Sequence, residues 1–188
     1  MLFRSKGEIT IPTADGEVGV AKTIDGKSYL FNSDGEMVTG LRILTYDGSK
    51  ITNISSGVDS VDTVKNMNSD TMKLVYFESN GAAKTGTTTI TLDGTSYTFS
   101  FKSNGSPRGV GETGISDGYI YQNGLRLTAD EDTKYGVVTY KNESYVVNEK
   151  GSIQKNKKNL KDADETYYCT NPKGILLHSS TEKCTAKH

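Results

Sequence analysis

Apolar and polar residues alternate most regularly between residues 89 and 101, on both sides of an Asp93-Gly94 turn. Before the turn, isoleucine and leucine alternate with threonine, and after it aromatic residues alternate with threonine and serine. A period of two is typical of a strand with one face in a core. Asp-Gly suits a two-residue hairpin turn, because glycine adopts positive φ without steric cost. The pattern predicts an antiparallel hairpin with one apolar face, which comprises Ile90, Leu92, Tyr97, Phe99 and Phe101.

The same arrangement is found in residues 24–40, whose sequence is IDGKSYLFNSDGEMVTG. An Asp25-Gly26 turn precedes an aromatic strand at residues 28–31, and a second turn at residues 32–35 precedes a short strand that ends before Gly40. This unit is too small to bury a core by itself. It therefore requires neighbours of the same kind on which to stack.

The order of turn, aromatic strand, turn and polar strand recurs along the chain. Each predicted copy closes on a glycine, and these glycines are Gly35, Gly81, Gly105, Gly124, Gly151 and Gly174. A near-constant step whose length drifts at the turns is typical of stacked β units. We therefore predict an all-β fold, a solenoid of stacked β-hairpin repeats of about 20–24 residues. An antiparallel meander whose turns happen to use glycine is the alternative.

The predicted organisation has three parts. Residues 1–23 are expected to form N-terminal capping strands, with Ile9 and Ile11 opposite Val18 and Val20. Residues 24–178 form the β-hairpin repeat array, and residues 179–188 form a polar tail that frays.

An irregular insertion is expected within the array at about residues 55–71. Val58, Val61 and Val64 recur there every third residue, which is compatible with one or two turns of a weak helix.

Composition excludes several classes of protein. Hydrophobic residues make up only 34% of the chain, and glycine is abundant, which suits thin sheets with narrow cores. The net charge is −1, and the basic run at residues 155–161 is interpreted as a solvated loop. A nucleic-acid partner is therefore not expected. No apolar run is long enough for a membrane span.

No pattern indicates catalysis or metal binding. Both histidines, His178 and His188, lie near the C-terminal end, and pairing of Cys169 with His178 is interpreted as incidental. The Asn-Gly turns resemble part of a calcium loop, but several carry lysine where a ligand is needed. We predict no enzyme activity, no cofactor and no metal. Cys169 and Cys184 either form one disulfide or remain free.

Residues 24–40 closely resemble the cell-wall-binding repeat of Gram-positive bacteria. The resemblance is fair over residues 76–105 and in phase over residues 117–178. The family includes choline-binding modules, glucan-binding domains of glucosyltransferases and the C-terminal repeats of large clostridial toxins. Its repeat of about twenty residues has an aromatic pair, a Tyr-Phe strand, an Asn-x-x-Gly turn and a Thr-Gly-Trp close. The resemblance implies a β-solenoid that adheres to a surface glycan or teichoic acid.

The chain departs from the family pattern in one respect, because it contains no tryptophan. Gly40-Leu41 and Gly86-Thr87 stand where family members have Gly-Trp. Choline-binding members hold their ligand in a cage of tryptophan and tyrosine through cation–π contacts. With tyrosine alone, the resemblance favours sugar binding through loops and tyrosine stacking, or a degenerate structural stack with no ligand.

The tyrosines on equivalent strands are the candidate ligand-binding residues, although most aromatic residues of a narrow stack are expected in the core. The candidates are Tyr29, Tyr76, Tyr97, Tyr119, Tyr121, Tyr145 and Tyr167. Tyr119 and Tyr121 share a strand face and are expected to form a stacking ladder for a sugar ring. The adjacent Tyr167 and Tyr168 must point to opposite faces, so one of them is expected to be exposed.

The hypothesis from sequence is a non-catalytic module that binds a bacterial cell-surface polymer or another glycan. The alternative is a structural or assembly protein of a surface structure or phage particle, whose repeats contact other protein subunits. An extracellular or cell-surface location follows from either hypothesis. The first residues lack the apolar stretch of a signal peptide, so the chain is expected to be a piece of a longer protein or a virion component.

Overall fold

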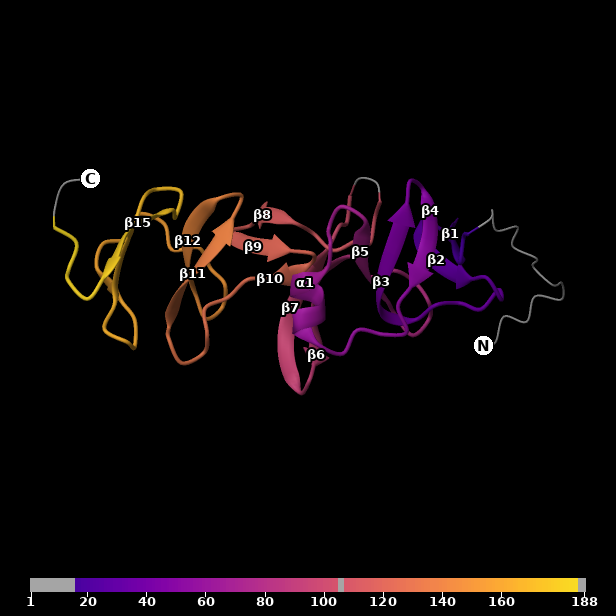
Figure 1. Cartoon of the computed structure of the whole chain (residues 1–188), viewed down its shortest axis with the longest axis horizontal. Coiled ribbons are helices and arrows are strands. Elements are labelled where there is room, and N and C mark those ends of the chain that lie inside the picture. Colours follow the sequence, from indigo (N-terminus) through magenta and orange to yellow (C-terminus); the bar gives the residue numbers. More distant parts are fainter. Residues whose placement is uncertain (1–15, 105–106, 186–188) are drawn as a thin grey trace. The chain divides into compact units, whose positions relative to one another are not determined.

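The protein is described by a computed structural model that covers residues 16–104 and 107–185. The chain divides into two compact units, unit 1 (Met1–Glu112) and unit 2 (Thr113–His188). The strands of unit 1 are β1 (Gly19–Ile24), β2 (Lys27–Asn32), β3 (Gly40–Asp47), β4 (Lys50–Ile54), β5 (Met72–Phe77), β6 (Gly86–Leu92) and β7 (Thr95–Phe101). They are coloured indigo to pink in Figure 1.

Five strands of unit 1 form an antiparallel sheet in the order β2-β1-β4-β3-β5, and β6 pairs with β7 as a hairpin. The predicted Asp25-Gly26 turn joins β1 to β2, with φ of 48° at the aspartate and 74° at the glycine. The Asp93-Gly94 turn joins β6 to β7 with φ of 48° and 78°. The predicted turn at Asp25-Gly26 and the predicted hairpin at Asp93-Gly94 are both confirmed, whereas the pairing of β1 with β2 was not predicted.

The core of unit 1 lies against the sheet. Its buried cluster comprises Leu30, Val38, Leu44, Ile51, Val75, Phe77 and Val110. On β7, Phe99 and Phe101 are fully buried, as the period-two pattern predicts. Ser100 is buried as well, although the pattern places it on the polar face. Its hydroxyl donates to Glu112 Oε2 at 2.9 Å, and this bond compensates for its burial.

The irregular segment of unit 1 contains a short helix, α1 (Val61–Asn66). Ser60 caps its N-terminus, because the serine hydroxyl accepts a hydrogen bond from the Asp62 backbone N–H at 3.2 Å. Val64 faces inward and is fully buried, which anchors a helix of low intrinsic propensity. In the described part of the chain, no helix is long and apolar enough to cross a membrane.

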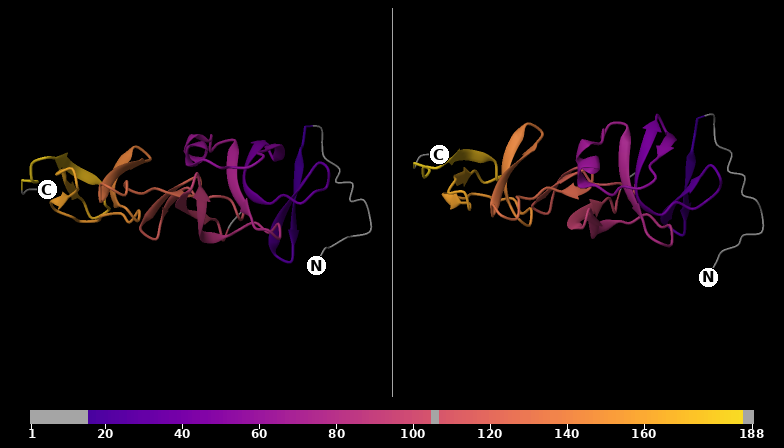
Figure 2. Two further views of the ribbon diagram at one scale, coloured as in Figure 1. Left: turned by 90° about the horizontal axis from the view of Figure 1, so that it is seen from below. Right: turned by 60° about the horizontal axis from the view of Figure 1, so that its bottom comes forward.

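Unit 2 consists of short strands. They are β8 (Gly114–Ser116), β9 (Tyr119–Gln122), β10 (Leu125–Arg126), β11 (Tyr135–Tyr140), β12 (Glu143–Asn148), β13 (Leu160–Lys161), β14 (Tyr167–Thr170) and β15 (Leu176–Ser180). β9 pairs with both β8 and β10, β11 pairs with β12, and β14 lies between β13 and β15. Figure 2 shows the β11–β12 hairpin in orange from two further sides.

The core of unit 2 is a second, smaller cluster. Its buried members are Ile120, Ala129, Tyr145, Val147 and Ile153. Cys169 and Cys184 form a disulfide, so the first of the two alternatives for the cysteines is the observed one.

The repeat is visible in the backbone hydrogen bonds of both units. Isolated antiparallel bridges join Phe31 to Met37, Phe77 to Ala83 and Val147 to Ile153 across equivalent turns. The Asn32 side chain accepts bonds from the backbone N–H groups of residues 34 and 36. Asn148 and Asn171 accept the equivalent bonds. These side-chain bonds to the backbone shape the turns.

Stacking within each unit follows one rule: a glycine of one repeat lies on the residue two positions after the turn glycine of the preceding repeat. A Cβ added to the glycine would collide with that residue, and the contacts are Gly81 on Met37, Gly109 on Ala83, Gly151 on Arg126 and Gly174 on Ile153. The prediction of an all-β fold built from stacked hairpin repeats is therefore confirmed. The meander alternative does not explain these repeated contacts.

Some expectations fall on residues outside the described ranges, namely Ile9, Ile11, Gly105 and His188. Within the described part, Val20 of β1 lies opposite Phe31 of β2. The Val18 N–H donates to the Ile51 carbonyl at 2.8 Å. The first hairpin therefore begins at Gly19, five residues before the start expected for the repeat array at residue 24.

Candidate ligand-binding site

The predicted tyrosines differ in exposure. Five are half-buried: Tyr29, Tyr76 and Tyr97 in unit 1, and Tyr119 and Tyr167 in unit 2. Tyr121 and Tyr145 are buried, with 4% and 5% of their surface exposed. Tyr167 is more exposed than its buried neighbour Tyr168, as expected for adjacent residues on opposite strand faces.

Tyr119 and Tyr121 do lie close together, but they do not form a parallel ladder. Their ring centroids are 6.5 Å apart and the ring planes are tilted by 56°. The Arg126 guanidinium lies 3.8 Å from the Tyr119 ring centroid, in cation–π geometry. Its Nη2 donates to the Tyr121 hydroxyl at 3.0 Å. This strand face therefore already holds a cation supplied by the protein, and the expectation of an open stacking ladder is wrong.

Two buried tyrosines of unit 2 donate hydrogen bonds to carboxylates. The Tyr145 hydroxyl donates to Glu143 Oε2 at 2.6 Å, and this bond together with burial raises the pKa of Tyr145 to about 12. The Tyr168 hydroxyl donates to Asp162 Oδ2 at 2.7 Å, and burial and this bond raise the pKa of Tyr168 to about 12. Both hydroxyls are committed to internal partners.

These shifts predict two late steps when the phenols are titrated. In the folded protein Tyr145 and Tyr168 should ionise near pH 12, about two units above an unperturbed tyrosine. Because their folded pKa values are raised, they stabilise the protein fully below pH ~10, and this contribution is lost as the pH rises from ~10 to ~12. Phenolate absorbance against pH measures the steps.

Variants assign the two steps. Tyr145→Phe and Tyr168→Phe should each remove one late-titrating phenol, while Glu143→Gln should shift the Tyr145 step to lower pH by removing the carboxylate. An unchanged Tyr145 step in Glu143→Gln would show that the hydrogen bond is not its main cause.

Unit 1 also contains a concave feature. A cavity of about 400 Å³ is bounded by the end of β2, the turn that follows it, the start of β3 and the end of β4. We call it the unit 1 cavity. Its lining residues are Val18, Asn32, Glu36, Met37, Val38, Thr39, Arg42, Asn53, Ile54 and Ser55.

One wall of the unit 1 cavity is built by the repeat turn itself. Asn32 Nδ2 donates to Glu36 Oε2 at 3.1 Å, and Asn32 Oδ1 accepts the Glu36 backbone N–H at 2.8 Å. The turn therefore fixes the carboxylate of Glu36 beside the cavity. Its second oxygen remains able to accept hydrogen bonds from a ligand.

The other polar wall is held by Arg42. Its Nε donates to the Thr39 carbonyl at 2.7 Å, and its Nη1 donates to the Ser55 carbonyl at 3.0 Å. A guanidinium carries five N–H donors, so donors remain for a ligand. Asn53 is exposed on β4 and adds an amide to the same lining.

Apolar side chains complete the lining. Met37 is 42% exposed, and Val18 and Ile54 are half-buried. The cavity thus offers carboxylate, guanidinium and amide groups beside an apolar surface. Such mixed lining suits a small polar organic ligand rather than a purely apolar one.

Glu36, Arg42 and Asn53 are not among the binding residues predicted from the sequence. Arg42 and Asn53 come together through the pairing of β3 with β4, and these strands carry no aromatic repeat signal. Glu36 lies in the turn after β2. The sequence signals for this hairpin are the glycine between the two strands, Gly48, and the apolar residues on either side of it, such as Ile43 and Ile51. No cluster of histidine, cysteine or carboxylate residues suited to a metal ion occurs in residues 16–104 and 107–185.

Neither a protein-family model nor a curated protein matches this chain. The chain is, however, similar to solved structures. CbpJ from Streptococcus pneumoniae is 18% identical, with a TM-score of 0.49, and the match covers 84% of this chain and 59% of CbpJ. Alternansucrase in complex with isomaltononaose is 17% identical, with a TM-score of 0.28, and the match covers 85% of this chain and 15% of that chain.

Choline binding protein F from Streptococcus pneumoniae, solved in the presence of a peptidoglycan analogue, is 17% identical with a TM-score of 0.24. The match covers 84% of this chain and 57% of that protein. The chain therefore spans less than two thirds of the length of CbpJ and of choline binding protein F. Choline-binding proteins, which the repeats resemble in sequence, are thus also among the solved structures to which this chain is similar.

Proposed function

We propose that this chain is a non-catalytic module that binds a glycan polymer of the bacterial cell surface, with the unit 1 cavity as its main binding site. The observation that carries the proposal is the mixed lining of that cavity. The resemblance of residues 24–40 to cell-wall-binding repeats supports the same class of ligand.

The chemistry of a sugar ring matches this lining. A pyranose presents hydroxyl groups at its edge and C–H groups on its face, so it needs hydrogen-bonding groups beside an apolar surface. Glu36 supplies acceptors, while Arg42 supplies donors and Asn53 supplies both. Met37 and Ile54 supply the apolar surface. A volume of about 400 Å³ is within the range of small-molecule sites.

The half-buried tyrosines are proposed as secondary contacts. Tyr29, Tyr76, Tyr97 and Tyr167 each keep part of a ring accessible on its strand. Shallow stacking sites of this kind are weak one by one, but a polymer that contacts several of them gains avidity. A location on or outside the cell surface is part of the proposal, because the polymer is found there.

Retention of the whole chain on purified Gram-positive cell walls tests the proposal. We expect the wild type to be retained, and the double variant Glu36→Gln, Asn53→Ala to bind about tenfold more weakly, since it loses one charged and one neutral hydrogen-bonding partner. The matched control is Asn66→Ala, Glu149→Gln, which makes the same chemical changes at exposed positions that do not belong to the cavity lining. The control should bind like the wild type.

Equal binding by both double variants would show that the unit 1 cavity is not the site. No retention of the wild type, together with self-association in sedimentation velocity, would favour the assembly role that is the alternative from sequence.

A further inference from the structure

A second concave feature of unit 1 is distinguished by its charge. It lies between the β1–β2 turn, the turn that follows β5 and the segment at Arg108, with a volume of about 160 Å³. Lys27, Lys84 and Arg108 contribute three cationic side chains to its lining, and Glu78 contributes one carboxylate. We call it the basic groove.

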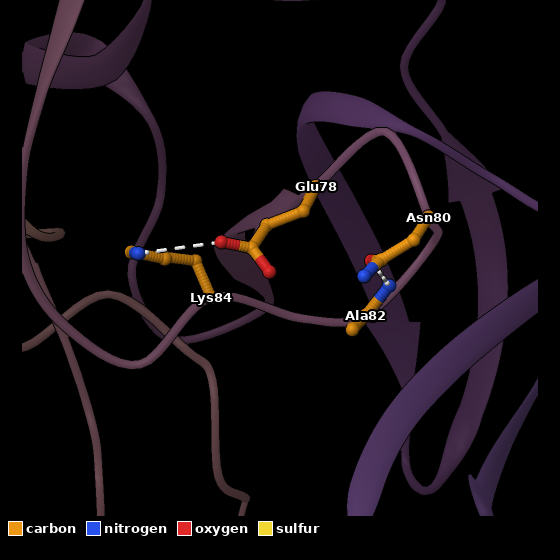
Figure 3. Close-up of polar contacts among 4 residues, drawn as sticks. All are labelled: Glu78, Asn80, Ala82 and Lys84. Carbon is orange, nitrogen blue, oxygen red and sulfur yellow. Dashed lines mark hydrogen bonds and ion pairs between the residues drawn. The ribbon is translucent and has the colours of Figure 1, made fainter.

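Among the described residues, one of the three cations, Lys84, has an ion-pair partner. Lys84 Nζ lies 3.3 Å from Glu78 Oε1 (Figure 3). Arg108 Nη1 donates to the Gly26 carbonyl at 3.4 Å, a neutral partner that leaves its charge in place. Lys27 is exposed and has no ion pair within the described ranges. The groove therefore carries an excess of two positive charges.

The walls of the groove are held by backbone bonds. The Ala83 N–H donates to the Ser28 carbonyl at 2.8 Å, which ties the segment after the β5 turn to the start of β2. Asn80 Oδ1 accepts the Ala82 N–H at 3.0 Å, and this bond shapes the turn between Glu78 and Lys84 (Figure 3). These bonds hold the segments that carry Lys27 and Lys84 beside each other.

The Arg108 side of the groove is held by the stacking rule. A Cβ added to Gly109 would lie 2.8 Å from the Ala83 Cβ, so only glycine lets the Arg108 segment approach this closely. The Gly109 N–H also donates to the Lys102 carbonyl at 2.9 Å. The juxtaposition of Lys27 and Arg108 therefore follows from the packing of three successive repeats.

We propose that the basic groove binds an anionic group, a phosphate or a carboxylate, carried by the polymer that unit 1 binds. This inference deepens the proposed function, because it makes the ligand an anionic polymer rather than a neutral glycan. Lysine and arginine pair with either oxyanion through charge-assisted hydrogen bonds. An anion in the groove would also relieve the repulsion between Lys27 and Arg108.

The site is open to solvent, so a single anion binds weakly and its binding is screened by salt. A polymer that places one anionic group in the groove while another unit occupies the unit 1 cavity gains affinity from the linkage. Binding of an anionic polymer should therefore fall steeply with ionic strength, whereas binding of a neutral polymer should not.

The experiment uses the whole chain and three soluble polymers: polyphosphate, polygalacturonate and neutral dextran. The groove variant is Lys27→Gln, Arg108→Gln, and the matched control is Lys50→Gln, Lys65→Gln, which removes the same charge from exposed lysines elsewhere in unit 1. At low salt we expect the groove variant to bind its polyanion about tenfold more weakly than the control does. The polyanion that shows the larger loss identifies phosphate or carboxylate as the bound group. Any binding of dextran should be the same in both variants.

Equal binding of both polyanions by the groove variant and the control would overturn the inference, as would absence of binding by the wild type. Retention on cell walls separates this result from the proposed function. If cell walls retain the chain but the groove variant binds the polyanions as well as the control does, only the glycan proposal stands. If the groove variant binds a polyanion more weakly than the control does but cell walls do not retain the chain, only the anion site in the basic groove stands.

Discussion

Gly151→Ala should lower the free energy of unfolding by about 3 kcal/mol. The residue has φ of 81°, where a Cβ costs about 1–2 kcal/mol. An added Cβ would also lie 2.7 Å from the Leu127 carbonyl oxygen and 2.9 Å from Arg126 Cδ. Relief of such a collision requires a backbone shift, which typically costs a further 1–3 kcal/mol or so.

Gly118→Ala is the matched control for this prediction. Gly118 also belongs to unit 2 and also has φ of 81°, but no heavy atom lies within 4 Å of its added Cβ. It should lose only the conformational cost, about 1–2 kcal/mol. The difference between the two variants in urea denaturation, followed by circular dichroism, measures the stacking contact alone. Equal losses would contradict the stacking rule.

The stacking rule explains which parts of the fold could be predicted from sequence. The Asp25-Gly26 turn and the Asp93-Gly94 hairpin depend on neighbouring residues only, so turn chemistry and a period of two predict them correctly. The recurrence of these hairpins predicts stacking, because a single hairpin buries too little. The residues in contact between repeats could not be predicted from the sequence. The contact of Gly151 with Arg126, for example, depends on how far each strand is offset from the next.

The candidate site could be predicted only in part. The sequence predicted tyrosines as the ligand-binding residues, but Tyr121 is buried and the Arg126 guanidinium lies over the ring of Tyr119. Pairing of β9 with β10 places Arg126 directly opposite Tyr121, and this register does not follow from the spacing of the tyrosines. The unit 1 cavity was missed for a related reason, because side chains such as Arg42 and Asn53 meet only through strand pairing.

Phe99→Ala should have the largest effect on stability, about 3–5 kcal/mol, the usual range for removal of a fully buried phenylalanine ring. The Phe99 side chain has no exposed surface. Its ring centroid is 6.3 Å from that of Phe101, with the planes within 11° of parallel. The substitution removes this ring contact and leaves a cavity on the buried face of β7. Urea denaturation of the whole chain measures the loss.

Tyr97→Ala provides the comparison, because Tyr97 lies two residues earlier on the same face of β7 and is only half-buried. If burial in a narrow core determines the cost, the loss in Tyr97→Ala should be less than half of that in Phe99→Ala, since less apolar surface is removed from the interior. Phe99→Leu should recover most of the stability by filling much of the cavity. Equal losses at Phe99 and Tyr97 would mean that aromatic strand propensity, rather than depth in the core, stabilises the hairpin. In that case tyrosine content alone would be a better guide to the stability of such repeats than burial.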